Sequence, residues 1–269
     1  MRADIALVER GLARSRNHAS ALIEAHRVLV SGKEVRKSSQ TIEADAHLVV
    51  LDAVEYVSRA GHKLAKALEA FGDLDVRGRL CLDVGASTGG FTDVLLRAGA
   101  DAILAIDVGH DQMVEDLKNN PRVISLEGIN AREMTLESLS SAAKSKFDES
   151  SFELVVADVS FISLTLILPA LKQVAPKADW VLLVKPQFEV GKTSLNASGI
   201  VNDHTLRAGA IKQVVSAASE LGYGVQGLTR SELPGTHGNV EYVLWITSSV
   251  LPNESKWFER IDEVAKESK

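Results

Sequence analysis

The chain has 269 residues, of which 45% are hydrophobic and 25% charged, fractions typical of a globular protein rather than a disordered or membrane-embedded one. Its longest apolar stretch, residues 161–171, is too short to cross a bilayer, and its first residues are too polar for a signal peptide, so we expect a cytoplasmic protein that does not associate with membranes. A single cysteine, Cys81, excludes an intrachain disulfide and lies in an apolar run, where a buried, inert thiol is expected. We predict no metal site.

The net charge is −6, but it is unevenly distributed along the chain. Residues 1–40 contain eight Lys or Arg and four acids, a net of +4 that leaves −10 for the remainder. Such a basic region favours binding to a polyanion, although a solvated helical face is the simpler alternative. The basic residues that we expect to contact RNA are Arg2, Arg14, Arg16, Arg27, Lys33, Arg36 and Lys37.

The pattern within this region predicts two helices and a small sheet. Apolar spacing predicts a helix over residues 4–10, and Ser15 can cap a second helix. A hairpin is predicted around residues 31–33, with a further strand over residues 47–51. This arrangement, with the motifs LVERGLAxSR and VLVSGK, resembles the RNA-binding domain of ribosomal small-subunit protein four. The resemblance covers residues 1–57 and implies that basic helix faces grip structured RNA by its shape and phosphates.

The second domain, residues 58–269, alternates strands with helices. Seven strands are predicted, over residues 80–84, 102–106, 123–126, 153–157, 180–184, 225–229 and 240–246. This alternation is typical of a doubly wound α/β sheet. The last two strands are joined by a loop without a helical pattern, which favours an antiparallel pair at the sheet edge. The order resembles the class I (Rossmann-like) methyltransferase fold.

The first of these strands leads into a glycine-rich turn, in the run LDVGASTGGFTD over residues 82–93. Backbone N–H groups in such a turn can approach a nucleotide-like ligand closely. The glycines do not follow the G-x-G-x-x-G dinucleotide fingerprint, and an acid precedes them, which suits a ligand with a cationic amino-acid end such as S-adenosylmethionine. A plain strand-to-helix turn is the alternative. The predicted cofactor residues here are Asp83, Gly85, Ala86, Ser87, Thr88, Gly89, Gly90 and Phe91.

Two later strand ends extend the predicted cofactor site. Asp107 ends the second strand, 22 residues after Gly85, near the offset at which a carboxylate accepts hydrogen bonds from ribose hydroxyls. Asp107 can also cap a helix over residues 110–117. Asn130 and Ala131 follow the third strand, where an adenine ring could be held.

Four charged residues stand where a catalytic site is expected. Ligands of such sheets bind at the carboxyl ends of the strands, so Asp158, after the fourth strand, is the first carboxylate to consider. Lys185 ends the apolar fifth strand, where it is poorly hydrated and readily loses its proton. Lys63 opens the first helix of the domain, and Glu241 lies in the last strand.

These four residues resemble the Lys-Asp-Lys-Glu tetrad of FtsJ-type ribose 2′-O-methyltransferases. The whole chain resembles the haemolysin A (TlyA) family of rRNA methyltransferases, through the motifs VSRxGHKL, DVGASTGGFT, ADVSFISL, LVKPQFEVGK and GNVEY. The resemblance implies methyl transfer from S-adenosylmethionine to a ribose 2′-OH of ribosomal RNA, at cytidine in characterised members. A ribose hydroxyl must lose its proton to react, so Lys185 is the expected general base, helped by the second cation Lys63. Asp158 would orient Lys185 beside the cofactor, and Glu241 would hold Lys63 or the ribose.

Residues 186–204 are predicted to form a long loop, and loops of this length in compact domains are usually functional. Lys192 is expected to contact RNA phosphate. Phe188 is expected either to stack on a displaced base or to pack in the core.

Other functions remain open at this point. A base methyltransferase usually needs a cysteine nucleophile or an Asn/Asp-Pro-Pro-Tyr/Phe motif, whereas residues 158–161 read DVSF. A nicotinamide oxidoreductase would need the missing glycine fingerprint. The chain could also be an RNA-binding protein with an inactive transferase domain. A membrane-active haemolysin, which the family name suggests, is not supported by any span or export signal.

Overall fold

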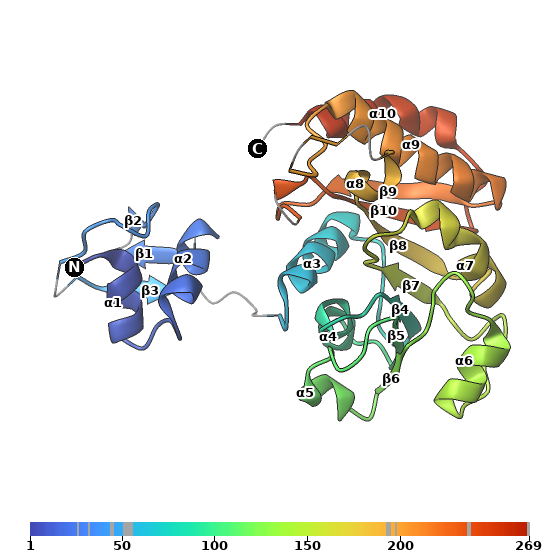
Figure 1. Ribbon diagram of the computed structural model, residues 1–269, viewed down its shortest axis with the longest axis horizontal. Coiled ribbons are helices and arrows are strands. Elements are labelled where there is room, and N and C mark those ends of the chain that lie inside the picture. Colours follow the sequence, from blue (N-terminus) through green and yellow to red (C-terminus); the bar gives the residue numbers. More distant parts are fainter. Residues whose placement is uncertain are drawn as a thin grey trace. The chain divides into compact units, whose positions relative to one another are not determined.

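The computed structural model describes residues 1–25, 27–31, 33–43, 46–50, 56–191, 195–196, 198–235 and 238–267. The chain divides into two compact units, Met1–Glu55 (unit 1) and Tyr56–Lys269 (unit 2), and each has a hydrophobic core of its own (Figure 1).

Unit 1 packs two short helices on a small antiparallel sheet. The helices are α1 (Ala3–Glu9) and α2 (Arg16–Glu24). Strand β1 (Val28–Val30) lies between β2 (Lys33–Glu34) and β3 (Leu48–Val50), and both pairings are antiparallel. The elements follow the predicted order.

Local sequence signals explain where the unit 1 helices begin and end. Gly11 follows α1 with a φ of +69°, a conformation that glycine adopts without steric cost. Ser15 caps α2, because its side chain accepts a hydrogen bond from the backbone N–H of His18 at 3.1 Å. Leu7 and Ile23 point from the two helices into the same fully buried core.

Unit 2 is built on a seven-stranded sheet with the order β6-β5-β4-β7-β8-β10-β9. The strands are β4 (Leu80–Val84), β5 (Ala102–Asp107), β6 (Val123–Glu127), β7 (Leu154–Ala157), β8 (Asp179–Val184), β9 (Gly224–Arg230) and β10 (Tyr242–Thr247). β10 runs antiparallel to both of its neighbours, and the other pairings are parallel. The predicted doubly wound sheet with its terminal antiparallel pair is confirmed.

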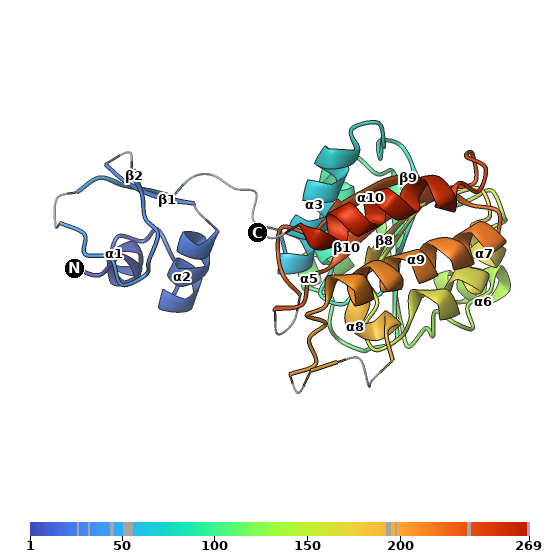
Figure 2. The same ribbon diagram turned by 90° about the horizontal axis from the view of Figure 1, so that it is seen from above.

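Helices cover both faces of this sheet (Figures 1 and 2). Successive residues of a strand point to opposite faces, so Cys81 packs in one core and Leu82 in the other. The Cys81 face carries α3 (Arg59–Phe71), α4 (Gly90–Arg97) and α5 (Glu115–Lys118). The opposite face carries α6 (Leu136–Ala143), α7 (Leu168–Val174), α9 (His204–Glu220) and α10 (Glu254–Lys266), with the 3-10 turn η1 (Leu164–Leu166) beside α7.

The structure differs from the prediction at two loops. The helix expected over residues 110–117 is the short α5, which begins only at Glu115 and is preceded by Val114 as its N-cap residue, so Asp107 caps no helix. The expected loop over residues 186–204 opens with the single-turn helix α8 (Pro186–Glu189), because proline is well suited to the first turn of a helix.

Burial raises the pKa of Cys81 to about 12, in keeping with the inert thiol expected from the sequence. Among the described residues, no helix combines the length and the apolar character that a membrane crossing requires.

Candidate active site

The glycine-rich turn between β4 and α4 shapes one wall of a cavity at the carboxyl ends of the parallel strands. Gly85 and Gly89 have φ angles of +82° and +97°, which a residue with a side chain rarely adopts. The cavity has a volume of about 140 Å³. Its lining comprises Ser58, Ala60, Gly85, Ala86, Ser87, Thr88, Gly90, Phe91, Asp158, Ser160 and Lys185. The ends of three strands that are distant in sequence, β4, β7 and β8, therefore share one cavity, as the fold predicts.

Gly85 makes the closest link between the turn and the strand that carries Asp158. A Cβ atom on Gly85 would lie 2.7 Å from the carbonyl oxygen of Asp158, a distance that real Cβ contacts essentially never show. Two separate constraints therefore favour glycine at position 85: the positive φ of its backbone and the close approach of the Asp158 carbonyl oxygen.

We expect Gly85→Ala to lower both the free energy of unfolding and the affinity for the cofactor. The matched control is Gly222→Ala, because Gly222 has a φ of +86° but open space where its Cβ would lie. The control should lose only the left-handed backbone cost, about 1–2 kcal/mol. Denaturant unfolding and calorimetric titration measure the two effects. Equal losses in both variants would mean that the approach to Asp158 is unimportant.

Asp83 lies beneath this turn and is fully buried. Its Oδ2 accepts a hydrogen bond from Thr92 Oγ1 at 2.6 Å, while its Oδ1 has no hydrogen-bond partner among the described residues. Burial raises the pKa of Asp83 to about 7, against the opposing effect of the Thr92 hydrogen bond. A buried carboxylate with an unsatisfied oxygen is suited to attract a cationic group.

Asp107, Asn130 and Ala131, at the carboxyl ends of β5 and β6, lie outside the cavity lining, as do Asp83 and Gly89. Asp107 accepts hydrogen bonds from Ser87 N at 2.8 Å and Gly109 N at 2.7 Å, so it fixes the glycine-rich turn. Asn130 and Ala131 follow β6, and the side chain of Asn130 is exposed and bonded to Glu133 Oε1 at 3.1 Å.

The first predicted catalytic pair joins the ends of β7 and β8. Lys185 Nζ lies 2.6 Å from Asp158 Oδ1 and donates a hydrogen bond to Ser160 Oγ at 2.8 Å. Both charged side chains are largely buried. Asp158 and Lys185 line the same cavity as the glycine-rich turn, although they are distant from the turn in sequence.

The second pair joins α3 to the start of β10. Lys63 Nζ donates to Glu241 Oε2 at 2.5 Å, and the side chains are only 9% and 2% exposed. Gln187 Nε2 donates to the other oxygen of Glu241, Oε1, at 3.3 Å. Since Gln187 follows Lys185 by two residues, α8 connects the two pairs. Each lysine therefore has its own carboxylate.

Sequence reasoning missed the residues that hold these groups in place. Glu189 is buried, and its carboxylate accepts hydrogen bonds from Ser163 Oγ at 2.5 Å and Leu164 N at 2.8 Å. Burial raises the pKa of Glu189, partly offset by the Ser163 hydrogen bond. This contact ties the loop after β7 to α8. Ser160 was visible in the DVSF motif, but its contact with Lys185 depends on the pairing of β7 with β8.

The ring of Phe188 lies beside Lys185, and the ring of Phe161 packs on Phe188. Phe161 is 91% exposed and has a φ of +66°, an unusual backbone conformation for a bulky residue. Its ring centroid is 5.3 Å from that of Phe188, and Lys185 Nζ is 5.8 Å from the Phe188 centroid. Phe188 is half-buried, so neither of the two alternatives predicted for it, stacking or core packing, is excluded.

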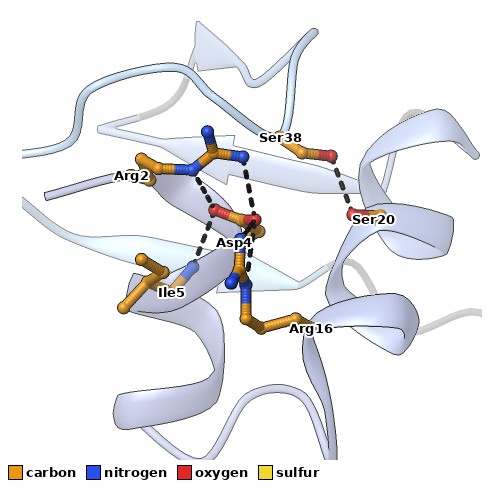
Figure 3. Close-up of polar contacts among 6 residues, drawn as sticks. All are labelled: Arg2, Asp4, Ile5, Arg16, Ser20 and Ser38. Carbon is orange, nitrogen blue, oxygen red and sulfur yellow. Dashed lines mark hydrogen bonds and ion pairs between the residues drawn. The ribbon is translucent and has the colours of Figure 1, made fainter.

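In unit 1, the basic residues predicted to bind RNA fall into two groups. Arg2 and Arg16 both form ion pairs with Asp4, as Figure 3 shows. Arg14, Lys33, Arg36 and Lys37 are exposed, and Arg27 is half-buried. Lys192 of unit 2 lies outside the described residues.

Comparison with known proteins is decisive at this point. The model for FtsJ-like methyltransferases matches residues 56–248, and that for the S4 domain matches residues 1–48. The 16S/23S rRNA (cytidine-2′-O)-methyltransferase TlyA of Mycobacterium tuberculosis is 48% identical over 248 residues, covering 91% of this chain and 89% of that protein. The chain belongs to the TlyA family of FtsJ-like methyltransferases.

Other TlyA relatives agree with this assignment. The rRNA methyltransferase YqxC of Bacillus subtilis is 40% identical over 90% of this chain and 84% of its own length. A solved structure described as a hemolysin, from Streptococcus thermophilus, has a TM-score of 0.72 at 35% identity and covers 98% of this chain and 94% of its own. The resemblance inferred from the sequence is thus confirmed, and the chain is a TlyA-type methyltransferase.

Proposed function

We propose that this protein transfers a methyl group from S-adenosylmethionine to the 2′-hydroxyl of a cytidine in ribosomal RNA, in the cytoplasm. The observation that carries the proposal is the buried Lys185–Asp158 contact at 2.6 Å, in the cavity that the glycine-rich turn also lines. A second buried contact, Lys63–Glu241 at 2.5 Å, is linked to it through Gln187. The printed names of TlyA relatives in Mycobacterium tuberculosis and Campylobacter jejuni support the reaction and the cytidine.

The residues around the turn fit the cofactor. S-adenosylmethionine supplies a methyl group that is already activated by its sulfonium. The unsatisfied oxygen of buried Asp83 suits the cationic amino-acid end, and the open backbone at Gly85 and Gly89 suits close approach of a nucleoside. Asp107, at the end of β5, is proposed to accept hydrogen bonds from the ribose hydroxyls.

Lys185 is the proposed general base. In its neutral form, Nζ accepts the proton of the ribose hydroxyl as the oxygen attacks the methyl carbon. Asp158, at 2.6 Å, then stabilises the positive charge that develops on the lysine, and Ser160 fixes the direction of Nζ. The carboxylate therefore favours the transition state over the neutral starting state.

Lys63 and Glu241 are proposed to hold the ribose. Glu241 fixes the ammonium of Lys63, which leaves other N–H donors of the ammonium for the substrate oxygen. The exposed ring of Phe161, packed on Phe188, offers a flat apolar surface on which a displaced base can stack.

Unit 1 is proposed to deliver the enzyme to its RNA. It matches the S4 domain, and its first 40 residues carry a net charge of +4 in a chain whose net charge is −6. Unit 2 is acidic overall and gains little electrostatic attraction from the phosphates of RNA, so binding depends on a separate basic surface.

The proposed function is tested with purified small and large ribosomal subunits and methyl-labelled cofactor, followed by mapping of the label. A 2′-O-methyl group blocks alkaline cleavage at the modified nucleotide, so the label should coincide with an alkali-resistant cytidine. Label in a base would contradict the proposal. Absence of transfer to either subunit would favour an RNA-binding protein with an inactive transferase domain.

A change of unit 1 tests the RNA-binding surface. The double variant Arg14→Ala, Lys37→Ala removes two exposed cations and should weaken binding to subunits and reduce the slope of log affinity against log salt by about one per lost phosphate contact. Lys177→Ala is the control, because Lys177 is exposed and lies just before the amino end of β8, whereas the active site lies at the carboxyl end of that strand. A slope equal to that of the control would mean that these residues do not meet phosphate.

A further inference from the structure

A buried carboxylate lies within the basic surface of unit 1. Asp4, in the first turn of α1, has only 4% of its side chain exposed. Arg2 donates from Nε to Oδ1 at 3.0 Å and from Nη2 to Oδ2 at 3.1 Å, and Arg16 donates from Nη2 to Oδ2 at 2.9 Å. Figure 3 shows the two guanidiniums on either side of the carboxylate. One acid therefore joins an arginine that precedes α1 to an arginine that opens α2.

The two arginines keep free donors on their outer sides. Their side chains are 47% and 61% exposed, and among the described residues the Nη1 atoms of Arg2 and Arg16 make no hydrogen bond or ion pair. A guanidinium has five N–H donors, so contact with Asp4 uses only some of them. Because the carboxylate is covered, a ligand that approaches this surface meets N–H donors and a net positive charge.

Further hydrogen bonds connect Asp4 to its surroundings. Asp4 Oδ1 also accepts a hydrogen bond from Ile5 N at 3.1 Å, and Asp4 N donates to Ser38 O at 3.1 Å. Ser38 Oγ in turn bonds to Ser20 Oγ of α2 at 3.0 Å (Figure 3). The segment that carries Lys37, directly before Ser38, is thus tied to both helices.

The charge on Asp4 persists under the conditions of RNA binding. The hydrogen bonds from Arg2 and then from Arg16 hold the pKa of Asp4 well below its ordinary range, although burial acts in the opposite direction. A carboxyl with a lowered pKa stays ionised throughout the neutral range and loses its contribution only in strong acid.

We propose that Asp4 is a positioning residue for RNA binding, which holds the guanidiniums of Arg2 and Arg16 together as one preformed site for an RNA phosphate. This inference rests on the proposed role of unit 1 in binding ribosomal RNA. Two unrestrained arginines would lose side-chain freedom when they bind. Asp4 already restrains the two arginine side chains when the domain folds. A phosphate therefore binds to guanidinium groups that are already ordered.

For the affinity for RNA, the proposal predicts the opposite of what the change in net charge alone would predict. In the full chain, Asp4→Asn makes unit 1 more positive, yet it should weaken binding to purified bacterial ribosomal subunits by on the order of tenfold and lower the salt slope by about one. Glu9→Gln is the control, because it adds the same charge at an exposed position of α1 that makes no ion pair among the described residues. The control should bind as tightly as the unchanged protein, or more tightly. Unchanged or tighter binding by Asp4→Asn would overturn the proposal.

A double-mutant cycle separates positioning from a merely structural role. If Asp4 acts through Arg16, the losses caused by Asp4→Asn and Arg16→Ala should be clearly less than additive. Additive losses would overturn the proposal. Circular dichroism establishes that each variant is folded. If Asp4→Asn unfolds unit 1, the double variant Arg2→Lys, Arg16→Lys decides, because it keeps both charges but loses the guanidinium groups, and unchanged affinity would then overturn the proposal.

The two proposals fail in different ways. If the double variant Arg2→Ala, Arg16→Ala binds subunits normally, the RNA-binding role of these arginines in unit 1 is wrong. If that variant binds weakly while Asp4→Asn binds normally, only the role of Asp4 is wrong.

Discussion

Replacing Lys185 with alanine is expected to lower the single-turnover rate of methyl transfer by roughly 10²–10⁴-fold, the usual contribution of a positioned acid–base group. The variant loses the Nζ atom that lies 2.6 Å from Asp158 and 2.8 Å from Ser160. Cofactor affinity should change little, because the glycine-rich turn is held by Asp107 and by the sheet rather than by Lys185. Rapid-quench measurement with labelled cofactor and excess enzyme is required, since product release can otherwise hide the chemical step.

Lys185→Arg is the informative control for this prediction. A guanidinium keeps the positive charge beside Asp158 but does not give up its proton near neutral pH. If Lys185 is the base, the arginine variant should be nearly as slow as the alanine variant. If the lysine acts only through its charge, arginine should restore most of the rate, and the general-base role would have to be abandoned.

The second large effect is expected at Asp83. Asp83→Asn preserves the shape of the side chain but removes the buried charge whose Oδ1 has no partner among the described residues. Loss of one member of a buried charge pair typically costs at least 2 kcal/mol, so affinity for S-adenosylmethionine should fall by about 30-fold or more. Isothermal titration calorimetry measures this directly, and unchanged affinity would remove Asp83 from the cofactor site.

Affinity at Asp83 should also depend on pH in a defined direction. Burial raises the pKa of Asp83 to about 7, so below that pH most free protein carries the neutral acid. A cationic ligand favours the ionised form, so affinity should rise by up to about tenfold per pH unit until it levels off near pH 7. The Asp83→Asn variant should lack this rise. Thr92→Val, which removes the hydrogen bond that lowers this pKa, should move the rise to higher pH.

The same pKa shift fixes the sign of a stability effect. The folded protein binds the Asp83 proton more tightly than the unfolded chain does, so the contribution of Asp83 to stability is present at low pH. It should be lost as the pH rises from about 4 towards 7. Thermal unfolding without cofactor, compared between the unchanged protein and Asp83→Asn, measures the difference.

The sheet was predictable because its central strands are buried on both faces. Residues 80–84 are apolar except for Asp83, and the structure has β4 at these same bounds. The Asp107 cap was mispredicted, since the carboxylate instead accepts hydrogen bonds from Ser87 N and Gly109 N. The carboxylate can accept hydrogen bonds either from the N-terminus of a helix or from the backbone of a turn, and the sequence does not distinguish between these two roles.

The family resemblance led us to expect Asp158 beside Lys185 and Glu241 beside Lys63 or the ribose, but the residues alone did not predict these contacts. Which lysine meets which carboxylate depends on strand order, since Lys185 and Asp158 end neighbouring strands whereas Glu241 reaches Lys63 through the reversed strand β10. The link from Glu189 to Ser163 likewise depends on two loops that become neighbours only when β7 and β8 pair.

The position of β10 between β8 and β9 has a consequence for the growing polypeptide. β10 is the last strand to be synthesised, yet it is inserted inside the sheet, so until it emerges β8 presents an unpaired edge. Lys63 likewise has no contact with Glu241 until that residue, 178 positions further along the chain, has been synthesised. A chain that is still being translated, close to the ribosome, therefore holds the glycine-rich turn and Lys185 but no complete Lys63–Glu241 pair.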